Sequence, residues 1–434
     1  MLLYCAHTSP RLRYVAGFIS RELLALPIRI TTDKEAFVGH YGPRINYSAE
    51  NIPDTFAITP ARLLFETGIG PQDISCFDHN GHKAFFATQG NLPFDIFAAA
   101  FYLITRYEEY LPHEKDPYGR YAHTNSLAWK EGFLDIPLVN YWLFDLKEAL
   151  KSVYPNLVFR HPDFKFAPTY DIDLAWSYLH KGWRRNLGAA LKELLTGKWG
   201  GLQQRLAVLL GRRKDPFDAY EWLDSLHLYC RLKPYYFFLV ASRCTGVDRN
   251  IPPSSTGLQE LIAYHAIGYR LGIHPSWRSG DREDLLKEEI EWLEEISGKK
   301  ITRSRQHYIR FTLPHTYRSL LAHHIEQDFS MGYGSINGFR ASVASSYNWY
   351  DLQKDEETRL RLMPFCFMDA NSYYEQHNTA AQAMSELLHY YHHIRKVGGL
   401  MVTVWHNDFL GANPQKAGWR EVYETFLKEE IYWD

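Results

Sequence analysis

The sequence predicts an α/β protein in which a smaller α+β domain, residues 1–150, precedes a distorted, TIM-like β/α barrel, residues 160–434. Two observations carry this prediction. The chain has 434 residues, which is enough for two domains of ordinary size. From about residue 166 onward, strand-like and helical segments alternate, which is typical of a parallel sheet whose strands are joined by crossover helices.

The first 150 residues show no such alternation. We expect β-rich segments over 25–32, 54–60 and 82–89, and helices over 94–111 and 139–150. Strands and helices in this mixed order favour a small α+β domain. No chemical motif stands out in it, and its role stays open.

The second region is expected to alternate strand and helix up to the end of the chain. The expected strands cover 166–172, 234–242, 270–274, 301–309, 328–333, 361–368 and 400–407. The expected helices cover 258–267, 283–298, 314–325, 380–397 and 419–431. Crossovers of this length place the helices outside a parallel sheet, and a closed or nearly closed barrel is the favoured form.

Composition narrows the class of protein. With 48 Lys+Arg against 50 Asp+Glu, the formal net charge is -2, so no overall field attracts nucleic acid, and we expect no nucleic-acid partner. The five cysteines are scattered and contain no C-x-x-C pair, which indicates reduced core residues. The N-terminus lacks the apolar stretch of a signal peptide, and no run of 18 apolar residues occurs, so we expect a cytoplasmic protein.

One segment, about residues 180–214, interrupts the alternation. Nine basic residues against the single acid Glu193 give it a local net charge of +8, namely Lys181, Arg184, Arg185, Lys192, Lys198, Arg205, Arg212, Arg213 and Lys214. Leucines between Leu187 and Leu210 fall near helical spacing. A basic amphipathic helix pair of this kind suits an anionic membrane surface or a phosphate-rich substrate. The alternative is a solvated helical excursion whose apolar stripe packs on the core.

Polar, titratable residues stand at the ends of most predicted barrel strands, where the loops of a β/α barrel converge on one mouth. In chain order they are Asp171 and Asp173, His274, Arg305 and His307, Asp369, and His406 with Asn407. Because Asp171 and Asp173 are two residues apart on a strand, both can reach the mouth, unless they only cap a turn. One carboxylate can bind a metal while the other serves as a base. His274 suits the metal, and His406 can protonate a leaving amine.

Five short motifs at these strand ends resemble, in order, those of the NodB-type polysaccharide deacetylases, the carbohydrate esterase 4-like family. They are TYDID at 169–173, GIHPSW at 272–277, SRQHY at 304–308, MDA at 368–370 and VWHN at 404–407. The resemblance covers about 165–434 and is closest to the branch with T-x-D-x-D in place of T-F-D-D-G. The N-terminal half resembles an uncharacterised domain that precedes such deacetylases in some bacteria.

The resemblance implies a role for each matching residue. Asp171 would be the general base that deprotonates water, with Arg305 orienting it. Asp173 and His274 would bind a divalent metal, usually zinc. His406 would be the general acid, and Asp369 would support the site from a neighbouring loop. We further expect Trp277, Arg278, Tyr308 and Asn407 to contact the substrate.

The chain departs from the family pattern at Arg278, where the family usually offers a second histidine ligand. A guanidinium stays protonated and cannot ligate a metal. His307 is the expected third ligand, with Asp281 or water as alternatives, while Arg278 is free to bind a phosphate or carboxylate of the substrate. This departure leaves open the alternative that the chain is a metal-free or inactive relative of the family.

The function expected from these features is hydrolysis of an amide, which removes an acyl group, most often acetyl, from N-acylated sugars of a glycan or glycan precursor. The alternatives are an inactive, carbohydrate-binding relative and a glycosidase that uses Asp171 and Asp369 as an acid–base pair. The +8 segment leaves open a peripheral contact with the inner face of an anionic membrane. The oligomeric state and the identity of the sugar are not predicted.

Overall fold

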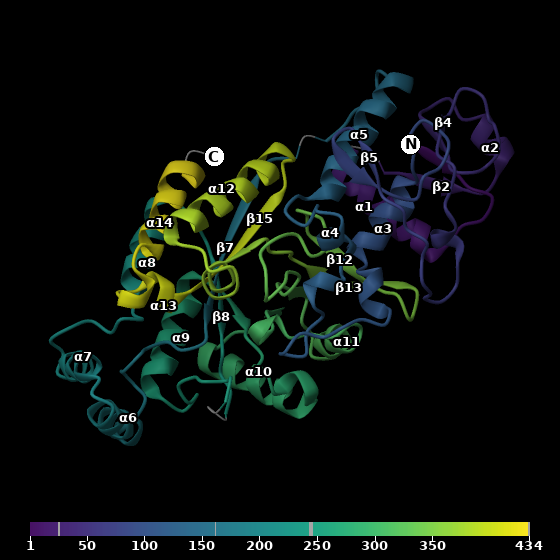
Figure 1. The fold of residues 1–434 in the computed structure, drawn as a ribbon. Helices are drawn as coiled ribbons and strands as arrows, with labels where there is room; N and C mark the ends of the chain where they lie inside the picture. The colour runs from purple at the N-terminus through teal and green to yellow at the C-terminus, as the bar shows by residue number, and fades with distance from the viewer. Residues whose placement is uncertain (25–26, 161, 243–245, 433–434) are drawn as a thin grey trace.

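The computed structural model describes residues 1–24, 27–160, 162–242 and 246–432 (Figure 1). It has an N-terminal region built on a small sheet and a larger α/β body, with a helical hairpin that projects from the body at the lower left of Figure 1. The α/β class and the large, mainly parallel sheet predicted from the sequence are confirmed.

The N-terminal region is organised around a parallel sheet of order β2-β1-β3-β4. These strands are β1 (Leu2–Tyr4), β2 (Arg29–Thr31), β3 (Arg44–Asn46) and β4 (Phe56–Ala57), and β5 (Phe77–His79) pairs with β6 (His82–Ala84). The helices are α1 (Pro10–Leu23), α2 (Lys34–Val38), α3 (Ile96–Ile104), α4 (Leu127–Lys130) and α5 (Leu138–Val153). Residues 25–26 of the strand predicted over 25–32 lie outside the described residues.

The helix predicted over 94–111 is wrong in its second half. Helix α3 ends at Ile104, and Arg106 takes a left-handed backbone conformation (φ 54°) before a short 3-10 helix over Tyr107–Tyr110. The guanidinium of Arg106 is held by the carboxylates of Glu108 and Glu109, at 2.8 and 2.7 Å. The chain therefore turns where a buried ion pair outweighs helical propensity.

The larger sheet has the order β12-β13-β11-β10-β9-β8-β7-β15-β14 within the described residues. Its strands are β7 (Lys165–Ile172), β8 (Tyr235–Phe238), β9 (Arg270–Ile273), β10 (Arg303–Ser304), β11 (Gln327–Asp328), β12 (Tyr347–Asp351), β13 (Glu356–Leu362), β14 (Phe367–Met368) and β15 (Leu400–His406). All neighbours pair in parallel except β12 with β13. Strands β12 and β14 are the two edges of this sheet among the described residues. Closure of the sheet into a barrel therefore stays a prediction.

Helices surround this sheet as the alternation predicted (Figure 1). They are α8 (Tyr220–Tyr229), α9 (Thr256–Gly268), α10 (Glu283–Ser297), α11 (His315–Ala322), α12 (Ala380–Lys396), α13 (Asn407–Leu410) and α14 (Trp419–Phe426). Each predicted helix of this region is present with its ends displaced by a few residues. The second half of the last one, Leu427–Ile431, continues as a π-helix.

Four of the strands predicted for this region are wrong in extent, and the one over 234–242 is limited to β8, Tyr235–Phe238. The strands over 301–309 and 328–333 shrink to two residues each, because side chains interrupt the ladder: Asp328 accepts hydrogen bonds from the Ser330 amide and the Ser304 hydroxyl at 2.9 and 2.8 Å. The strand over 361–368 divides into β13 and β14. The antiparallel β12–β13 pair was not predicted, and it packs against α1 of the N-terminal region.

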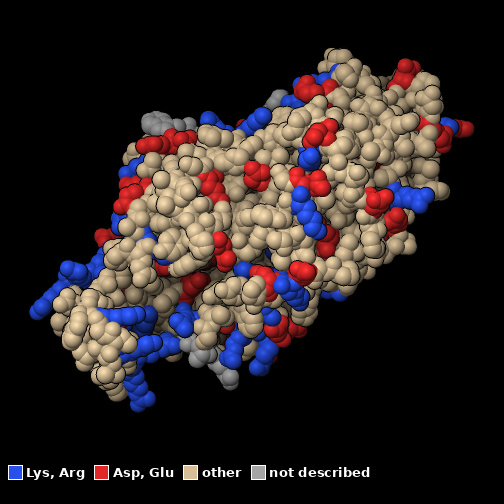
Figure 2. Space-filling view, viewed as in Figure 1, with Lys and Arg blue, Asp and Glu red and all other residues tan. Residues whose placement is uncertain are grey.

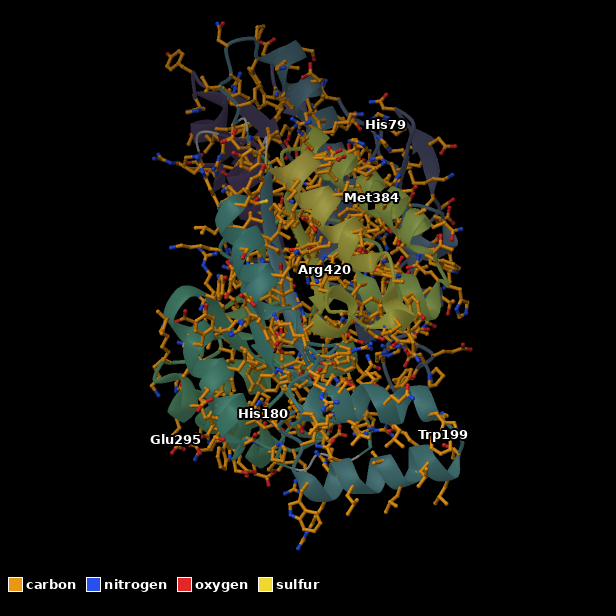
Figure 3. The ribbon with its side chains drawn as sticks, turned by 90° about the vertical axis from the view of Figure 1, so that its left-hand side faces the viewer. His79, His180, Trp199, Glu295, Met384 and Arg420 are labelled. Atoms are coloured by element: carbon orange, nitrogen blue, oxygen red, sulfur yellow. The ribbon has the colours of Figure 1, made fainter. Side chains whose placement is uncertain are left out.

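The basic segment folds into two helices, α6 (Trp183–Leu195) and α7 (Trp199–Leu209), that stand away from the body (Figures 1 and 3). Figure 2 shows lysine and arginine side chains gathered on this lobe. The alternative in which its apolar stripe packs on the core is wrong, since Trp183 and Leu195 are 70% and 85% exposed. Within the described ranges, no helix combines the length and apolar character needed to cross a bilayer.

One cluster of buried apolar residues runs through both regions of the chain. A buried ion network joins them: Glu109 of the N-terminal region accepts hydrogen bonds from Arg340 of the body at 2.8 and 2.7 Å, and from Arg106. The boundary near residue 150 stays a prediction. Cys5, Cys230 and Cys366 are buried and free, Cys76 is free and partly buried, and Cys244 lies outside the described residues.

Candidate active site

A cavity of about 620 Å³ lies at the carboxyl ends of the parallel strands. Strand β7 contributes Asp171 and the loop after it Asp173, while β9 leads to His274 and β15 ends at His406. His307 and Tyr308 reach it from the short turn that follows β10. Of the residues predicted at the strand ends, Asp171, Asp173, His274, His307 and His406 therefore meet in one cavity. Arg305, Asp369 and Asn407 do not line it.

Asp173, His274 and His307 form a cluster that fits a metal ion, because one ligand atom of each lies within 4.8 Å of the others. The Asp173 carboxylate lies 3.1 Å from His274 Nε2 and 3.5 Å from His307 Nε2. Asp173 Oδ1 is buried and has no hydrogen-bond partner among the described residues. Two imidazole nitrogens and a carboxylate oxygen are a donor set that zinc accepts.

The imidazoles of His274 and His307 both direct Nε2 toward the Asp173 carboxylate. His274 Nδ1 donates to the Arg305 backbone carbonyl at 2.6 Å, and His307 Nδ1 donates to the buried Asp248 carboxylate at 2.9 Å. A proton on Nδ1 leaves Nε2 with its lone pair available, as metal-binding histidines require. Asp248 was not predicted, and it follows no motif that the sequence analysis used.

The charges in this cluster reinforce one another. Burial by itself raises the pKa of Asp173, but the facing His307 and His274 imidazoles hold it well below its ordinary value. Burial lowers the pKa of His307, whereas Asp173 and Asp248 raise it to about 9. Without a cation between them, the carboxylates therefore keep a proton on His307, and a metal ion would take that proton's place.

Asp171 is held apart from this cluster by Arg305. Arg305 Nη1 donates to Asp171 Oδ1 at 2.9 Å, while Asp171 Oδ2 lies 3.9 Å from His274 Nε2. Both side chains are buried, and the guanidinium also donates to the Phe329 carbonyl. Arg305 thus fixes one oxygen of the Asp171 carboxylate by a charge-assisted hydrogen bond and leaves the other oxygen for the pocket.

His406 is fixed by Asp369. His406 Nδ1 lies 2.6 Å from Asp369 Oδ1, and Asp369 Oδ2 accepts the His406 backbone N–H at 2.7 Å. His406 Nε2 faces the pocket, 3.9 Å from Asp173 Oδ2. Burial lowers the pKa of His406, but Asp369, followed by Asp173 and Asp171, raises it to about 10. This imidazole is therefore protonated at neutral pH and can act as an acid.

Of the four residues predicted to contact the substrate, one lines the pocket and three do not. Tyr308 lines the pocket, whereas Trp277, Arg278 and Asn407 do not. The exposed Arg278 lies outside it, the Trp277 ring lies under the Arg310 guanidinium at 4.0 Å, and the Asn407 amide donates to backbone carbonyls such as that of Phe217. Their contacts with substrate stay predictions.

Asp281, the alternative third ligand, lies elsewhere. Its carboxylate accepts two hydrogen bonds from Arg310, at 2.8 and 2.6 Å, and its side chain is exposed. It does not line the pocket that holds Asp173 and His274. The geometry therefore brings His307, and not Asp281, to the metal-binding cluster.

Two pocket residues come from the N-terminal region and were missed by sequence reasoning. The rings of Tyr118 and Tyr308 lie 5.2 Å apart at 37°, and Arg120 donates to the carbonyls of Tyr308 and Gly334 at 2.8 and 2.9 Å. A Cβ on Gly334 would lie 2.8 Å from the Tyr308 carbonyl oxygen, so only glycine fits there. No local signal marks Tyr118 or Arg120, because their role depends on how the two regions pack.

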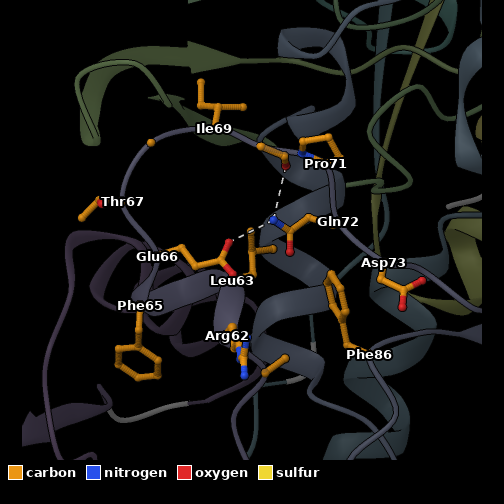
Figure 4. A pocket seen from close by; sticks show the side chains of 13 residues that line it. Arg62, Leu63, Phe65, Glu66, Thr67, Ile69, Pro71, Gln72, Asp73 and Phe86 are labelled. Atoms are coloured by element: carbon orange, nitrogen blue, oxygen red, sulfur yellow. Dashed lines mark hydrogen bonds between the residues drawn. The ribbon is translucent and has the colours of Figure 1, made fainter.

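A second hollow, of about 850 Å³, lies wholly in the N-terminal region (Figure 4). Its charged side chains are Arg62, Glu66 and Asp73, and Glu66 accepts a hydrogen bond from Gln72 at 3.0 Å. No histidine or cysteine lines it. It therefore lacks the converging acid, base and ligand groups of the first pocket.

Known proteins resemble parts of this chain. A family of unknown function, DUF7033, matches residues 1–155, and no curated protein matches the sequence. A candidate polysaccharide deacetylase from Mycobacterium smegmatis has a TM-score of 0.40 and 16% identity, over 63% of this chain and 85% of that one.

Two further solved structures are similar over the same share of the chain. PuuE allantoinase has a TM-score of 0.40 and 11% identity, over 62% of this chain and 84% of that one. A polysaccharide deacetylase from Bacillus cereus has a TM-score of 0.30 and 10% identity, over 62% and 89%. What the chain does must therefore be inferred from the geometry of its own pocket.

Proposed function

We propose that this protein is a metal-dependent hydrolase that removes an acyl group, most often acetyl, from the nitrogen of an N-acylated sugar. The observation that carries the proposal is that one cavity joins three kinds of group: a carboxylate base, a metal-binding cluster and a protonated histidine. These are the groups that hydrolysis of an unactivated amide requires. The ordered motifs that resemble the NodB-type deacetylases support the same reaction.

Asp173, His274 and His307 would hold the metal ion, which we expect to be zinc. One carboxylate oxygen and two imidazole nitrogens are ligands that zinc accepts. Because Nδ1 of each imidazole is already hydrogen-bonded, Nε2 is the nitrogen that would bind the metal. A divalent ion bound there polarises the acyl carbonyl and lowers the pKa of water.

Asp171 acts as the base that takes a proton from the attacking water. Arg305 binds Asp171 Oδ1, which leaves Asp171 Oδ2 for the water. This Oδ2 lies 3.9 Å from His274 Nε2 of the metal-binding cluster. The water oxygen bonds to the acyl carbon, and the carbon–nitrogen bond breaks afterwards. Arg305 fixes the direction of this base, because its guanidinium is buried and anchored to the Phe329 carbonyl.

His406 supplies the proton that the departing nitrogen needs. Its Nε2 faces the pocket and carries a proton at neutral pH, since Asp369 stabilises the imidazolium. The products are a free carboxylate and an amino sugar. The base and the acid lie on neighbouring strands, β7 and β15, whose register pairs Asp171 with His406.

Carbohydrate is the substrate class that the pocket wall favours. Tyr118 and Tyr308 present tilted aromatic rings at one side, and flat apolar faces with polar edges suit sugar rings. Polar groups such as Asn371 and Asp408, together with apolar ones such as Met368 and Phe409, line the rest. The length and identity of the glycan are left to experiment.

The glycosidase alternative needs Asp369 as a free acid or base. Asp369 is fully buried and does not line the pocket, and both of its oxygens accept hydrogen bonds from His406. A carboxylate occupied in this way cannot exchange protons with a glycosidic oxygen. The geometry therefore favours the amide hydrolase over the glycosidase.

Elemental analysis and acetate release from N-acetylated amino-sugar oligomers test the proposal. Wild type should carry roughly one zinc or similar ion per chain. His274→Ala should lose both the ion and the acetate release, whereas His392→Ala, an exposed histidine of α12, should keep both. New reducing ends without acetate would select the glycosidase. A chain with neither ion nor activity would be the carbohydrate-binding relative.

A further inference from the structure

Buried polar contacts lie between helices α6 and α7, and large apolar side chains lie on the outer side of this hairpin. Arg205 of α7 is buried and donates to both oxygens of Glu193 in α6, at 3.1 and 2.7 Å, and to Asn186 at 2.8 Å. These bonds hold the two helices together. Because buried polar contacts already close the hairpin, its leucines are not needed for that purpose.

The outer surface of the hairpin is instead apolar. On α6 the exposed residues are Trp183, Leu187, Leu191, Leu194 and Leu195, at helical spacing, and on and after α7 they are Trp199, Leu206, Leu209 and Leu210. Leu195 is 85% and Leu210 64% exposed. Water-exposed leucines scattered singly are ordinary, but nine large apolar side chains on one projecting lobe indicate a binding surface.

Basic residues accompany this apolar surface. Arg184, Arg185, Lys192, Lys198, Arg212, Arg213 and Lys214 are exposed, and Figure 2 shows the lobe ringed by lysine and arginine. Arg205 pairs with Glu193 and Lys214 with Glu221, at 2.7 and 3.0 Å, so these two cations add little to the positive charge of the hairpin. Together the leucines and cations give the hairpin two separate means of attraction.

We propose that the α6–α7 hairpin binds the surface of an anionic lipid bilayer. Leucine and tryptophan side chains enter the boundary between headgroups and acyl chains, while lysine and arginine attract anionic headgroups. Nucleic acid is a less suitable partner, because its phosphates would bind the cations but the leucines would stay in water. A second protein chain would need acids opposite the cations, and the bilayer offers both chemistries at once.

The hairpin is anchored at the edge of the sheet that carries the pocket. It follows the carboxyl end of β7, and α6 begins at Trp183, ten residues after Asp173. At its base the buried carboxylate of Asp215 accepts the backbone N–H groups of Ser177, Tyr178 and Phe217, at 2.8, 2.8 and 3.0 Å. In Figure 3 His180 marks this base, and Trp199 lies toward the far end of the hairpin. Binding at the hairpin therefore holds this edge of the enzyme near the bilayer.

Flotation of the full chain with vesicles tests the proposal. Vesicles of phosphatidylcholine with phosphatidylglycerol should carry wild type upward, and vesicles of phosphatidylcholine alone should carry about tenfold less or lower. Raising the salt should weaken the binding, because the attraction of the cations is screened. Failure of wild type to float with the anionic vesicles would overturn the proposal. This readout needs no substrate, so it is independent of the proposed hydrolysis.

Two pairs of variants separate the contributions. Leu187→Glu with Leu195→Glu should reduce binding at least about tenfold. The control, Ile267→Glu, replaces a residue outside the hairpin with the same 85% exposure as Leu195 and should bind like wild type. Lys192→Glu with Lys198→Glu should also reduce binding about tenfold or more, whereas Lys287→Glu with Lys354→Glu should not. Loss of vesicle binding in either control, or wild-type vesicle binding in either hairpin variant, contradicts the assignment of the hairpin as the membrane-binding surface.

Self-association is the competing use of the same surface. Sedimentation velocity should show wild type and Leu187→Glu/Leu195→Glu in the same oligomeric state. A wild-type oligomer that dissociates in this variant, without vesicle binding, would assign the hairpin to a second copy of the chain. Because the substituted side chains are exposed, circular dichroism should be the same for all variants.

Discussion

Asp369 contacts His406 twice, once at the imidazole Nδ1 at 2.6 Å and once at the backbone N–H at 2.7 Å. One buried carboxylate thus sets the position of the histidine, the tautomer of its ring and its charge. The ring cannot rotate without losing a charge-assisted hydrogen bond in a dry environment. This contact makes His406 an acid with a defined direction.

Asp369→Asn should lower kcat by about 100-fold or more, because the imidazolium loses the carboxylate that stabilises it. Below its pKa His406 holds the proton that the leaving nitrogen takes. Asp369, more than Asp173 and Asp171, raises that pKa to about 10 against the effect of burial. Its removal therefore lowers the pKa and should move the alkaline limb of the kcat–pH profile to lower pH, by at least about one unit.

The matched control is Asp135→Asn, which alters the ion pair of Asp135 with His389 at the surface, 3.2 Å apart. It should leave the kcat–pH profile unchanged. An Asp369→Asn enzyme with the wild-type alkaline limb would show that His406 is not the acid.

Asp248→Asn should weaken metal binding about 10- to 100-fold while every proposed ligand stays in place. Its carboxylate holds His307 Nδ1 at 2.9 Å and so directs Nε2 at the cluster. Competition with a chelator of known affinity measures the change. Asp281→Asn, at the alternative ligand, should leave metal affinity unaltered because that carboxylate pairs with Arg310. Equal weakening by both variants would argue against the His307 site.

Tyr118→Ala should raise KM by several-fold to about tenfold, with a smaller effect on kcat, because the ring lies in the wall and touches no reacting group. Steady-state kinetics on oligomers of increasing length measures it. The control is Tyr41→Ala, a fully exposed tyrosine in the same N-terminal region. An unchanged KM in Tyr118→Ala would remove the N-terminal region from substrate binding.

Glu109→Gln should lower the free energy of unfolding by about 3–5 kcal/mol, because it leaves Arg340 and Arg106 buried without their counter-charge. Urea denaturation followed by fluorescence measures this loss. The control, Glu148→Gln, alters an exposed Lys151 pair and should change the free energy little. If Glu109→Gln were equally harmless, the network would not join the two regions.

The same residue predicts a dependence of stability on pH. Burial raises the pKa of Glu109, but Arg340 and then Arg106 hold it at about 2, below the ordinary value of 4.5. A depressed pKa means that this stabilisation is fully present above about pH 4.5 and is lost as pH falls toward 2. Wild type should therefore lose stability across this range more steeply than Glu109→Gln does.

Some of the site could be predicted from the sequence because parallel strands bring their carboxyl ends to one edge. Asp171, His274 and His406 each stand at or just after the end of a strand that is recognisable by its apolar run. Their meeting follows from the parallel direction of these strands, which the alternation of strands with helices predicted. The helices were predicted for the same local reason, namely their apolar periodicity.

Other features depend on contacts between residues far apart in the chain. Tyr118 and Arg120 reach the pocket only because the N-terminal region packs against the turn that holds Tyr308. Asp248 orients His307 across a separation of 59 residues. No periodicity or motif records such contacts, since they arise when two folded surfaces meet.

The sequence by itself determined the α/β class, the carboxylates and histidines at the strand ends, and the amphipathic character of the basic segment. Only the tertiary structure decided that His307, and not Asp281, joins Asp173 and His274, and that the leucines of α6 and α7 face solvent. Helical spacing shows that one face is apolar, but burial depends on what packs against that face. Here Arg205 and Glu193 occupy the inner side, so the apolar face is left outside.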